Sequence, residues 1–176
     1  MISLARVDAI ESQLCLKINR FGSVRPIRTF FAAISRLGDW PFWVIIGAVF
    51  FALYGSAAVY PGAHIIVTVA IGVALYKALK NVLVRERPYV FNGHIVAGTP
   101  ALDRYSFPSG HTQHAFCITA MLATYAPELL IVTVPFTLLV AASRVILGLH
   151  YPTDVIAGAA LGLALAKLSM GLFPLV

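Results

Sequence analysis

The feature that most constrains this chain is a long stretch without charge. No Asp, Glu, Lys or Arg occurs from Trp40 to Tyr76. A helix needs about 20 mostly apolar residues to cross the hydrocarbon core of a bilayer. Tyr60-Pro61-Gly62 interrupts the stretch, so we predict two membrane-spanning helices, over residues 40–60 and 63–82, joined by a tight turn.

The remainder of the chain holds three more apolar segments, over residues 111–126, 129–149 and 154–172. Only 11% of the 176 residues are charged and 60% are hydrophobic, whereas a soluble domain carries about 25% charged residues. We therefore predict an all-α integral membrane bundle of about five spanning helices. This composition excludes an ordinary soluble enzyme, a disordered chain and a nucleic-acid-binding domain. Gly158 and Gly162 give the last helix a face of small residues, and we expect it to pack closely inside the bundle.

Residues 1–39 have a different character. Apolar residues recur there at helical spacing between charged ones, first at Leu4, Val7, Ile10, Leu14 and Ile18 and again over residues 26–37. This pattern predicts amphipathic helices, either lying in the membrane interface or packing over the polar end of the bundle. We accordingly divide the chain into an N-terminal arm, 1–39, and a transmembrane domain, 40–176.

Ionisable side chains are costly at membrane depth, so each one near a predicted span is a candidate functional residue. In an antiparallel bundle, the end of the second span and the start of the third lie on the same side of the membrane as the end of the fourth and the start of the fifth. The polar residues gather at these four helix ends: Lys80 and Arg87, Ser109, Gly110 and His111, Arg144 and His150, and Asp154. We therefore expect three distant stretches of the chain to form one site.

The residue types of this cluster indicate phosphate chemistry. Lys80, Arg87 and Arg144 supply positive charge with no matching excess of carboxylates, which suits a phosphate or diphosphate. Ser109-Gly110 adds the N–H groups of a helix start. His150 and Asp154 are four residues apart, so a carboxylate can orient one imidazole nitrogen and leave the other as a nucleophile.

His111 then remains to protonate the departing oxygen. The arrangement describes phosphoryl transfer through a phosphohistidine, with no metal or other cofactor. The two cysteines, Cys15 and Cys117, provide neither a disulfide framework nor metal-binding spacing.

The same residues carry a family resemblance. Lys80-Asn-Val-Leu-Val-Arg-Glu-Arg87-Pro88 resembles the K-x6-R-P signature of the type-2 phosphatidic acid phosphatase superfamily. Pro108-Ser109-Gly110-His111 is similar to its P-S-G-H motif, and Ser143-Arg144, His150 and Asp154 resemble its S-R-x5-H-x3-D motif. The three motifs stand complete and in order, and the resemblance covers residues 40–172.

The resemblance implies the same roles. His150 would be the nucleophile, Asp154 its orienting aspartate and His111 the general acid. The phosphoryl oxygens would be bound by Lys80, Arg87, Ser109, Gly110 and Arg144. The resemblance also implies hydrolysis of a lipid phosphate or diphosphate in a bacterial cytoplasmic (inner) membrane. Undecaprenyl diphosphate is the favoured substrate, with phosphatidylglycerophosphate or phosphatidate as alternatives. Many relatives have six spans, so five spans and an arm depart from that pattern.

Two other functions use the same residues. A lipid phosphotransferase would replace water by a second lipid as phosphoryl acceptor. A non-catalytic protein could bind anionic lipid, although binding alone needs no pair of histidines. The cations of the arm favour a site on the cytoplasmic side by the positive-inside rule, whereas the resemblance implies a site facing the periplasm or cell exterior, which we adopt.

Several polar residues are given plainer roles. Lys77 and Arg85 are expected to snorkel toward the interface rather than contact substrate. His114 is expected to pack between helices or to support His111 from behind. His64 and His94 are expected to be ordinary helix-end or loop residues.

Overall fold

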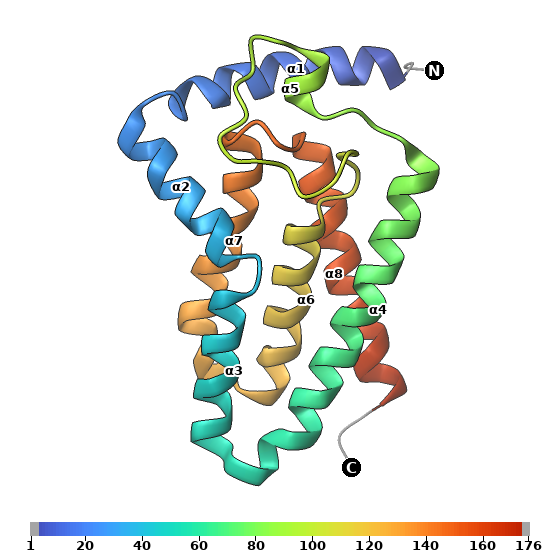
Figure 1. The fold of residues 1–176 in the computed structure, drawn as a ribbon. Coiled ribbons are helices and arrows are strands. Elements are labelled where there is room, and N and C mark those ends of the chain that lie inside the picture. The colour runs from blue at the N-terminus through green and yellow to red at the C-terminus, as the bar shows by residue number, and fades with distance from the viewer. Residues whose placement is uncertain (1–3, 174–176) are drawn as a thin grey trace.

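A computed structural model describes residues 4–173, and every regular element within this range is a helix. The elements in chain order are α1 (Leu4–Phe21), α2 (Arg25–Leu37), α3 (Pro41–Tyr54), the 3-10 turn η1 (Gly55–Ala58), α4 (Val59–Leu83), α5 (Pro88–Phe91), α6 (Gly110–Tyr125), the 3-10 turn η2 (Pro127–Leu129), α7 (Leu130–Ile146) and α8 (Pro152–Leu172). Helices α3, α4, α6, α7 and α8 run side by side (Figure 1). The prediction of an all-α bundle is confirmed.

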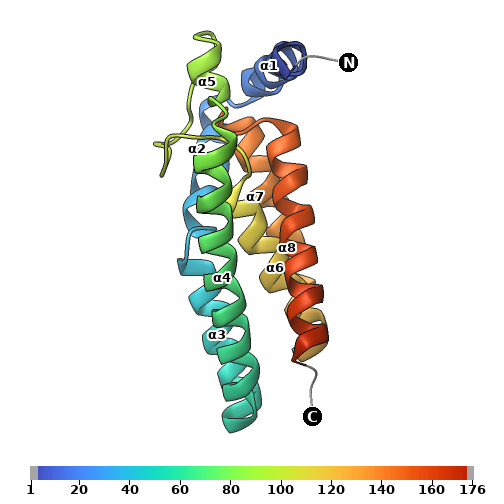
Figure 2. The same cartoon turned by 90° about the vertical axis from the view of Figure 1, so that its right-hand side faces the viewer.

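The two helices of the arm pack on the bundle in different ways. Helix α1 lies across one end of it, and α2 runs along α7 toward the start of α3 (Figure 1); Figure 2 views α1 nearly along its axis above the other helices. The inner face of α1 buries Ser12, Cys15 and Asn19. The Asn19 amide donates to the carbonyls of Val96 (3.0 Å) and Ile146 (2.9 Å). The arm therefore covers the polar end of the bundle.

The break in the uncharged stretch lies earlier than we expected. The chain turns at Gly55, which has φ +55°, whereas Pro61 and Gly62 lie in the first turn of α4. A proline is tolerated there because the first N–H groups of a helix have no intrahelical acceptor. The predicted boundary at Tyr60-Pro61-Gly62 was therefore wrong by one helical turn.

Helix α6 lies at the centre of the bundle, in contact with α4, α7 and α8. Gly158 and Gly162 permit its close approach to α8. A Cβ atom added at Gly158 would lie 2.5 Å from the Ser109 carbonyl oxygen, and one at Gly162 would lie 2.4 Å from that of Gln113. The predicted packing of this small-residue face inside the bundle is confirmed.

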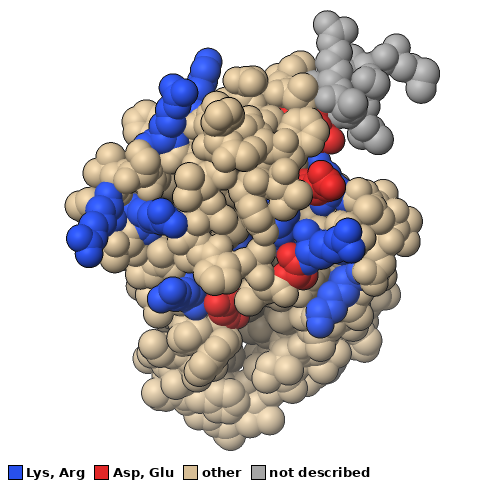
Figure 3. Space-filling model, turned by 45° about the horizontal axis from the view of Figure 1, so that its top comes forward, with Lys and Arg blue, Asp and Glu red and all other residues tan. Residues whose placement is uncertain are grey.

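Within residues 4–173, three stretches are long and apolar enough to cross a membrane: Pro41–Phe91, which contains both α3 and α4, Pro127–Ile146 and Pro152–Leu172. Helix α6, with 16 residues, lies among them, and the count of five spans stays a prediction. The charged side chains visible in Figure 3 gather toward the end that carries α1, and other residues form the lower part of that face. This division is typical of a bundle with its body in lipid and one end in water.

Candidate active site

A polar cavity of about 260 Å³ opens at the end of the bundle near α1. Six of the eight predicted site residues line it: Lys80, Arg87, Gly110, His111, Arg144 and His150. They come from α4 and the segment after it, the start of α6, and the end of α7 with the turn that follows. Three stretches that are distant in sequence therefore share one cavity, whereas Ser109 and Asp154 lie behind its wall.

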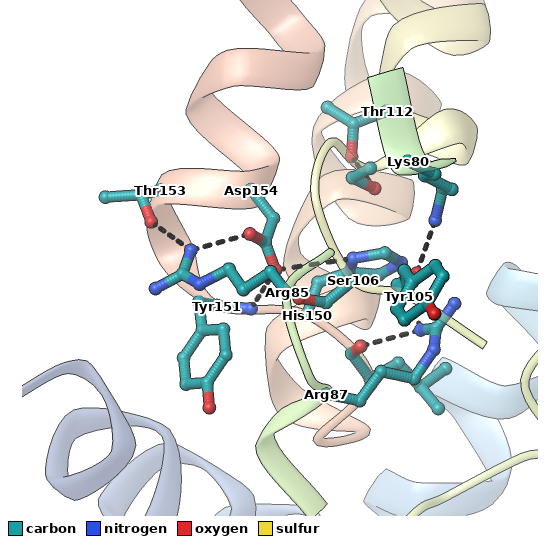
Figure 4. A network of polar contacts seen from close by, with 12 residues as sticks. Lys80, Arg85, Arg87, Tyr105, Ser106, Thr112, His150, Tyr151, Thr153 and Asp154 are labelled. Atoms are coloured by element: carbon teal, nitrogen blue, oxygen red, sulfur yellow. Dashed lines mark hydrogen bonds and ion pairs between the residues drawn. The ribbon is translucent and has the colours of Figure 1, made fainter. Parts of the chain in front are cut away.

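His150 presents one ring nitrogen to the cations of the cavity. Its Nε2 atom lies 3.3 Å from Nη1 of Arg87 (Figure 4). An arginine N–H only donates hydrogen bonds, so Nε2 is the accepting nitrogen and the proton is on Nδ1. Burial and nearby positive charges, Arg144 first, hold the pKa of His150 well below its ordinary 6.5. The imidazole is therefore neutral, with its free lone pair toward the cations.

Asp154 lies behind His150. Its Oδ2 atom accepts the Tyr151 N–H at 2.8 Å and lies 3.5 Å from His150 Nδ1. The second distance is too long for a direct hydrogen bond, and Nδ1 has no hydrogen-bond partner among the described residues. The carboxylate is fully buried, and its other oxygen, Oδ1, accepts from Arg85 at 2.7 Å. Asp154 thus faces the back of the imidazole, as the motif predicts, with a longer contact than a direct hydrogen bond.

The turn between α7 and α8 requires a glycine before His150. Gly148 has φ +69°, a conformation that favours glycine. A Cβ atom there would also lie 2.6 Å from the Ile95 side chain. This turn brings His150 back toward the end of α7, where its N–H donates to the Arg144 carbonyl at 3.1 Å.

The cations of the cavity have a carboxylate partner that the sequence did not reveal. Asp103 Oδ1 lies 2.8 Å from Lys80 Nζ and 2.6 Å from Arg87 Nη2. Burial alone would raise the pKa of Asp103, but the hydrogen bond from Lys80 and the charge of Arg87 lower it overall. This pairing, in which one carboxylate serves two of the three cations, was not foreseen from the sequence. An anionic group already occupies the place suited to phosphate.

His111 and Arg144 occupy the side of the cavity next to α2. His111 Nε2 is hydrogen-bonded to a carboxylate oxygen of Asp39, from the loop between α2 and α3. Arg144 is 3% exposed, donates to the Ser35 hydroxyl and has no partner for its Nε in the described part of the chain. Burial opposes ionisation of Asp39, but the hydrogen bond from His111 and the charge of Arg144 lower the pKa of its carboxyl overall.

Ser109 lies behind the wall of the polar cavity. Its side chain is fully buried, its N–H donates to the Asp154 carbonyl at 3.0 Å, and its hydroxyl is 2.9 Å from that of Thr112. The Ser109 N–H is therefore engaged inside the protein and its side chain is not part of the cavity wall, so a contact between Ser109 and phosphate stays a prediction. Its bond to Asp154 joins the start of α6 to the start of α8.

Gly110 does line the cavity, next to the ring of Tyr76. A Cβ atom at Gly110 would lie 3.1 Å from the Tyr76 ring. Glycine therefore leaves the first turn of α6 open, where the N–H groups of Gly110 and His111 have no intrahelical acceptor. These N–H groups and the positive end of the helix dipole suit an anion.

A second cavity, of about 390 Å³, adjoins the first. The two share Asp39, Trp40 and His114 in their walls. The second cavity lies between α3, α4 and α6 and is lined mainly by apolar side chains, among them Trp43, Phe50, Ile65, Val69 and Ile118. The polar cavity therefore adjoins an apolar groove, which we call the α3–α4 groove.

The residues given plainer roles are placed as follows. Lys77 is exposed on α4, and His114 packs its ring against Tyr76 at 5.5 Å between centroids. His64 lies near the start of α4, at the opposite end of that helix from Lys80, and is hydrogen-bonded to Tyr125 and Ser169 at 2.6 Å each.

His94 is exposed in the loop after α5. Arg85 corrects our expectation, because its side chain is only 14% exposed and is paired with carboxylates instead of snorkelling.

Sequence reasoning missed the acidic residues around the site: Asp8, Glu11, Asp39 and Asp103. A signal was available, because the chain has only seven Asp and Glu residues. Carboxylates so scarce in an apolar chain are expected to be paired where they approach its interior. Their partners could not be read from the sequence, since each lies at least 16 residues away.

A membrane bundle with a cavity that combines clustered cations and a neutral imidazole defines a class of protein that handles phosphate groups on lipids. Residues 61–175 match the sequence model of the PAP2 superfamily. The chain belongs to the PAP2 superfamily, as the motif resemblance predicted, and is a membrane phosphatase of this type.

Three relatives show the range of this similarity. Undecaprenyl-diphosphatase from Sulfolobus acidocaldarius is 26% identical over 88% of this chain and 74% of its own length. Phosphatidylglycerophosphatase B from Bacillus subtilis is 32% identical over 74% of this chain and 66% of its own length. Lipid A 1-phosphatase from Rhizobium etli is 33% identical over 63% of this chain. The match spans only 48% of that last protein.

Two solved structures share the fold. The transmembrane PAP2-type phosphatidylglycerolphosphate phosphatase from Bacillus subtilis has a TM-score of 0.72 and 28% identity, over 96% of this chain and 85% of that one. Aquifex aeolicus LpxE has a TM-score of 0.75 over 90% of this chain and 93% of its own. At 24% identity, the second likeness concerns the fold alone.

Proposed function

We propose that this protein hydrolyses a lipid phosphate or diphosphate through a phosphohistidine on His150, with undecaprenyl diphosphate as the favoured substrate. The observation that carries the proposal is that the two cavities adjoin and share Asp39, Trp40 and His114 in their walls. Cations and an imidazole nitrogen line one, and apolar side chains of α3, α4 and α6 line the other. A phosphate head group fits the first and a hydrocarbon chain fits the second.

The first chemical step forms a bond between His150 Nε2 and the terminal phosphorus of the substrate. It breaks the bond from that phosphorus to the leaving oxygen, which is the bridging oxygen of a lipid diphosphate or the ester oxygen of a lipid monophosphate. Lys80, Arg87 and Arg144 stabilise the charge on the phosphoryl oxygens. Protonated His111 donates its proton to the departing oxygen. For these contacts to form, the substrate phosphate must replace the Asp103 carboxylate on Lys80 and Arg87.

The second step consumes water. Water attacks the phosphorus of the phosphohistidine, His111 accepts its proton, and the bond from phosphorus to Nε2 breaks. Orthophosphate leaves and both histidines return to their starting protonation states. Asp154 stabilises the positive charge on the imidazole of His150 while the nitrogen is phosphorylated. No step of this proposed mechanism requires a metal ion, so phosphate release is expected to continue in the presence of a chelator.

The choice of undecaprenyl diphosphate is supported by the name of the Sulfolobus relative, to which 88% of this chain aligns. Phosphatidylglycerophosphate and phosphatidate remain the alternative substrates. The decisive assay is phosphate release by purified protein from these three lipids and from a soluble phosphate ester, with chelator present. His150→Ala is expected to abolish release, whereas His94→Ala, at an exposed loop histidine, is expected to retain it.

The assay also separates the other two functions. A phosphorylated second lipid in place of free phosphate would identify a phosphotransferase. Lipid binding without turnover of any substrate would identify a non-catalytic protein. Acid-labile label on the wild-type chain after incubation with ³²P-labelled substrate, absent from His150→Ala, is the expected signature of the phosphohistidine.

The site is proposed to face the outer side of a cytoplasmic membrane. Glu86 is exposed near the site, and Lys167 is exposed toward the opposite end of α8. In intact cells, a membrane-impermeant maleimide is expected to label Glu86→Cys and to spare Lys167→Cys. The native Cys15 and Cys117 are both buried and give a low background. The reverse labelling pattern would place the site in the cytoplasm.

A further inference from the structure

All three nitrogens of the Arg85 guanidinium group donate hydrogen bonds to other side chains of the protein. Nη1 donates to Asp154 Oδ1 and Thr153 Oγ1, each at 2.7 Å. Nη2 donates to Asp8 and Glu11 at 2.6 Å each, and Nε donates to Asp8 at 3.0 Å. Arginine has five N–H donors, and these are five contacts. No donor remains for a substrate.

Arg85 also lies outside the polar cavity, on the other side of Asp154 from His150. Figure 4 shows the Asp154 carboxylate with Arg85 on one side and the imidazole of His150 on the other. The guanidinium group rests 4.0 Å from the centre of the Tyr151 ring. The N–H of that same Tyr151 holds the second carboxylate oxygen of Asp154. Arg85 and Tyr151 together thus fix both oxygens.

The N-terminal arm also takes part in this hydrogen-bond network, through Asp8 and Glu11 of α1. Glu11, on α1, is 7% exposed and accepts from the Thr153 N–H at 2.9 Å and from the Thr153 hydroxyl at 2.6 Å. A carboxylate is favoured at this first turn of α8 because the start of a helix carries partial positive charge. Through Arg85 and Thr153, α1 therefore holds the start of the helix that carries Asp154.

We propose that Arg85 is a positioning residue for the reaction, and that Asp8 and Glu11 of the arm hold it in place. The inference rests on the proposed function, in which Asp154 orients His150. Since the carboxylate is 3.5 Å from Nδ1, a small rotation decides whether it supports the imidazole. Arg85 prevents that rotation and supplies the one positive charge among three carboxylates. Without it, Asp154, Asp8 and Glu11 would repel one another.

The kinetic test uses purified protein with phosphatidate in detergent micelles and with a soluble phosphate ester. Arg85→Gln is expected to lower kcat by on the order of tenfold to a hundredfold, the loss that is typical when a residue holding an active-site side chain in place is replaced. KM is expected to stay within about twofold because Arg85 does not touch substrate. Glu11→Gln should lower kcat less, and Arg20→Gln, at an exposed arginine of α1, should leave it unchanged.

A double-mutant cycle shows whether Arg85 acts through Asp154. If it does, Arg85→Gln combined with Asp154→Asn will be no slower than Asp154→Asn alone. Fully additive losses would overturn the inference, and so would a raised KM with wild-type kcat. If Arg85→Gln does not fold, the cycle is run with Arg85→Lys, which keeps the charge but cannot reach all four partners. Wild-type kcat in both Arg85→Lys and Glu11→Gln would equally overturn it.

A second readout does not depend on turnover. In protein labelled with ¹⁵N-histidine, we expect the His150 ring to carry its proton on Nδ1 in the wild type and to lose this preference in both Arg85→Gln and Asp154→Asn. An unchanged signal in Arg85→Gln contradicts the positioning role even if no substrate is turned over. Failure of the proposed function, seen as absence of phosphate release by the wild type, is thus distinguishable from failure of this inference.

Discussion

The Oδ1 atom of Asp103, in the wall of the polar cavity, lies 2.8 Å from Nζ of Lys80. The same oxygen reaches Arg87. The carboxylate therefore takes the position in which a phosphoryl oxygen would be bound. Since the pKa of Asp103 is lowered from its ordinary 3.8, this competing charge persists at every pH at which the enzyme would be assayed.

Replacement of Asp103 should strengthen anion binding. In Asp103→Asn, Lys80 and Arg87 lose their internal counter-charge, so we expect inhibition by orthophosphate to require on the order of tenfold less phosphate, about 1.4 kcal/mol. The measurement is the inhibition constant of orthophosphate. Glu86→Gln makes the same change of charge at an exposed position and should have little effect. Weaker inhibition in Asp103→Asn would instead show that the carboxylate organises the two cations.

The contact between Asp39 and His111 predicts a change in the pH profile. The pKa of Asp39 is lowered, so its negative charge is present at neutral pH and favours the protonated form of His111. Asp39→Asn removes that charge, and the loss of kcat at alkaline pH should begin about one pH unit lower. The measurement is kcat against pH with a soluble ester. An alkaline limb identical to that of Glu128→Gln, at the other end of the bundle, would contradict the prediction.

The lowered pKa of His150 predicts activity well into the acid range. In the proposed mechanism the neutral imidazole is the nucleophile, and it is protonated only when the pH falls below its folded-state pKa, which lies well below 6.5. We therefore expect kcat/KM to show no acid limb near pH 6.5 that belongs to this residue. Its pH profile between 4 and 8 is the measurement. If kcat/KM falls below pH 6.5 and this fall persists when each of the other histidines is replaced, His150 titrates normally and the prediction is wrong.

The same shift links stability to pH. In the unfolded chain, His150 takes up a proton as the pH falls through about 6.5, whereas in the folded protein it does not. The free energy of unfolding should therefore fall as the pH drops below 6.5, and it should fall less in His150→Gln. Denaturant unfolding at pH 7 and pH 5 measures the difference. His94→Gln, at an exposed loop position, should keep the wild-type dependence.

The α3–α4 groove predicts a selective effect on lipid substrates. Gly47 lines this groove, and a Cβ atom there would meet nothing within 4 Å. Gly47→Leu should fill the groove without strain and raise KM for a long-chain lipid, while KM for a soluble ester stays unchanged. Ala48→Leu, on the neighbouring exposed position, is the matched control. Equal effects of Gly47→Leu on both substrates would exclude the groove as the binding place of the chain.

The sequence by itself determined the class of fold and most of the polar cavity. An uncharged stretch from Trp40 to Tyr76 leaves a chain no option but burial in lipid or protein, and a helix satisfies its backbone there. Helix direction then requires the ends that carry Arg87, His111 and His150 to meet on one side. Both features follow from local sequence patterns and from the connectivity of the helices.

Only the tertiary structure decided which charges pair. Asp103 and Asp39 lie in loops, where no periodicity fixes the direction of a side chain. Glu11 lies on an arm helix, whose periodicity does not show what that helix packs against. Arg85 looked like an interfacial residue because its sequence neighbours are polar, yet its partners come from α1 and α8. Ser109 belonged to a recognisable motif, but packing against α8 turned its N–H inward. Contacts between distant segments depend on how whole helices dock, and a linear pattern does not contain that information.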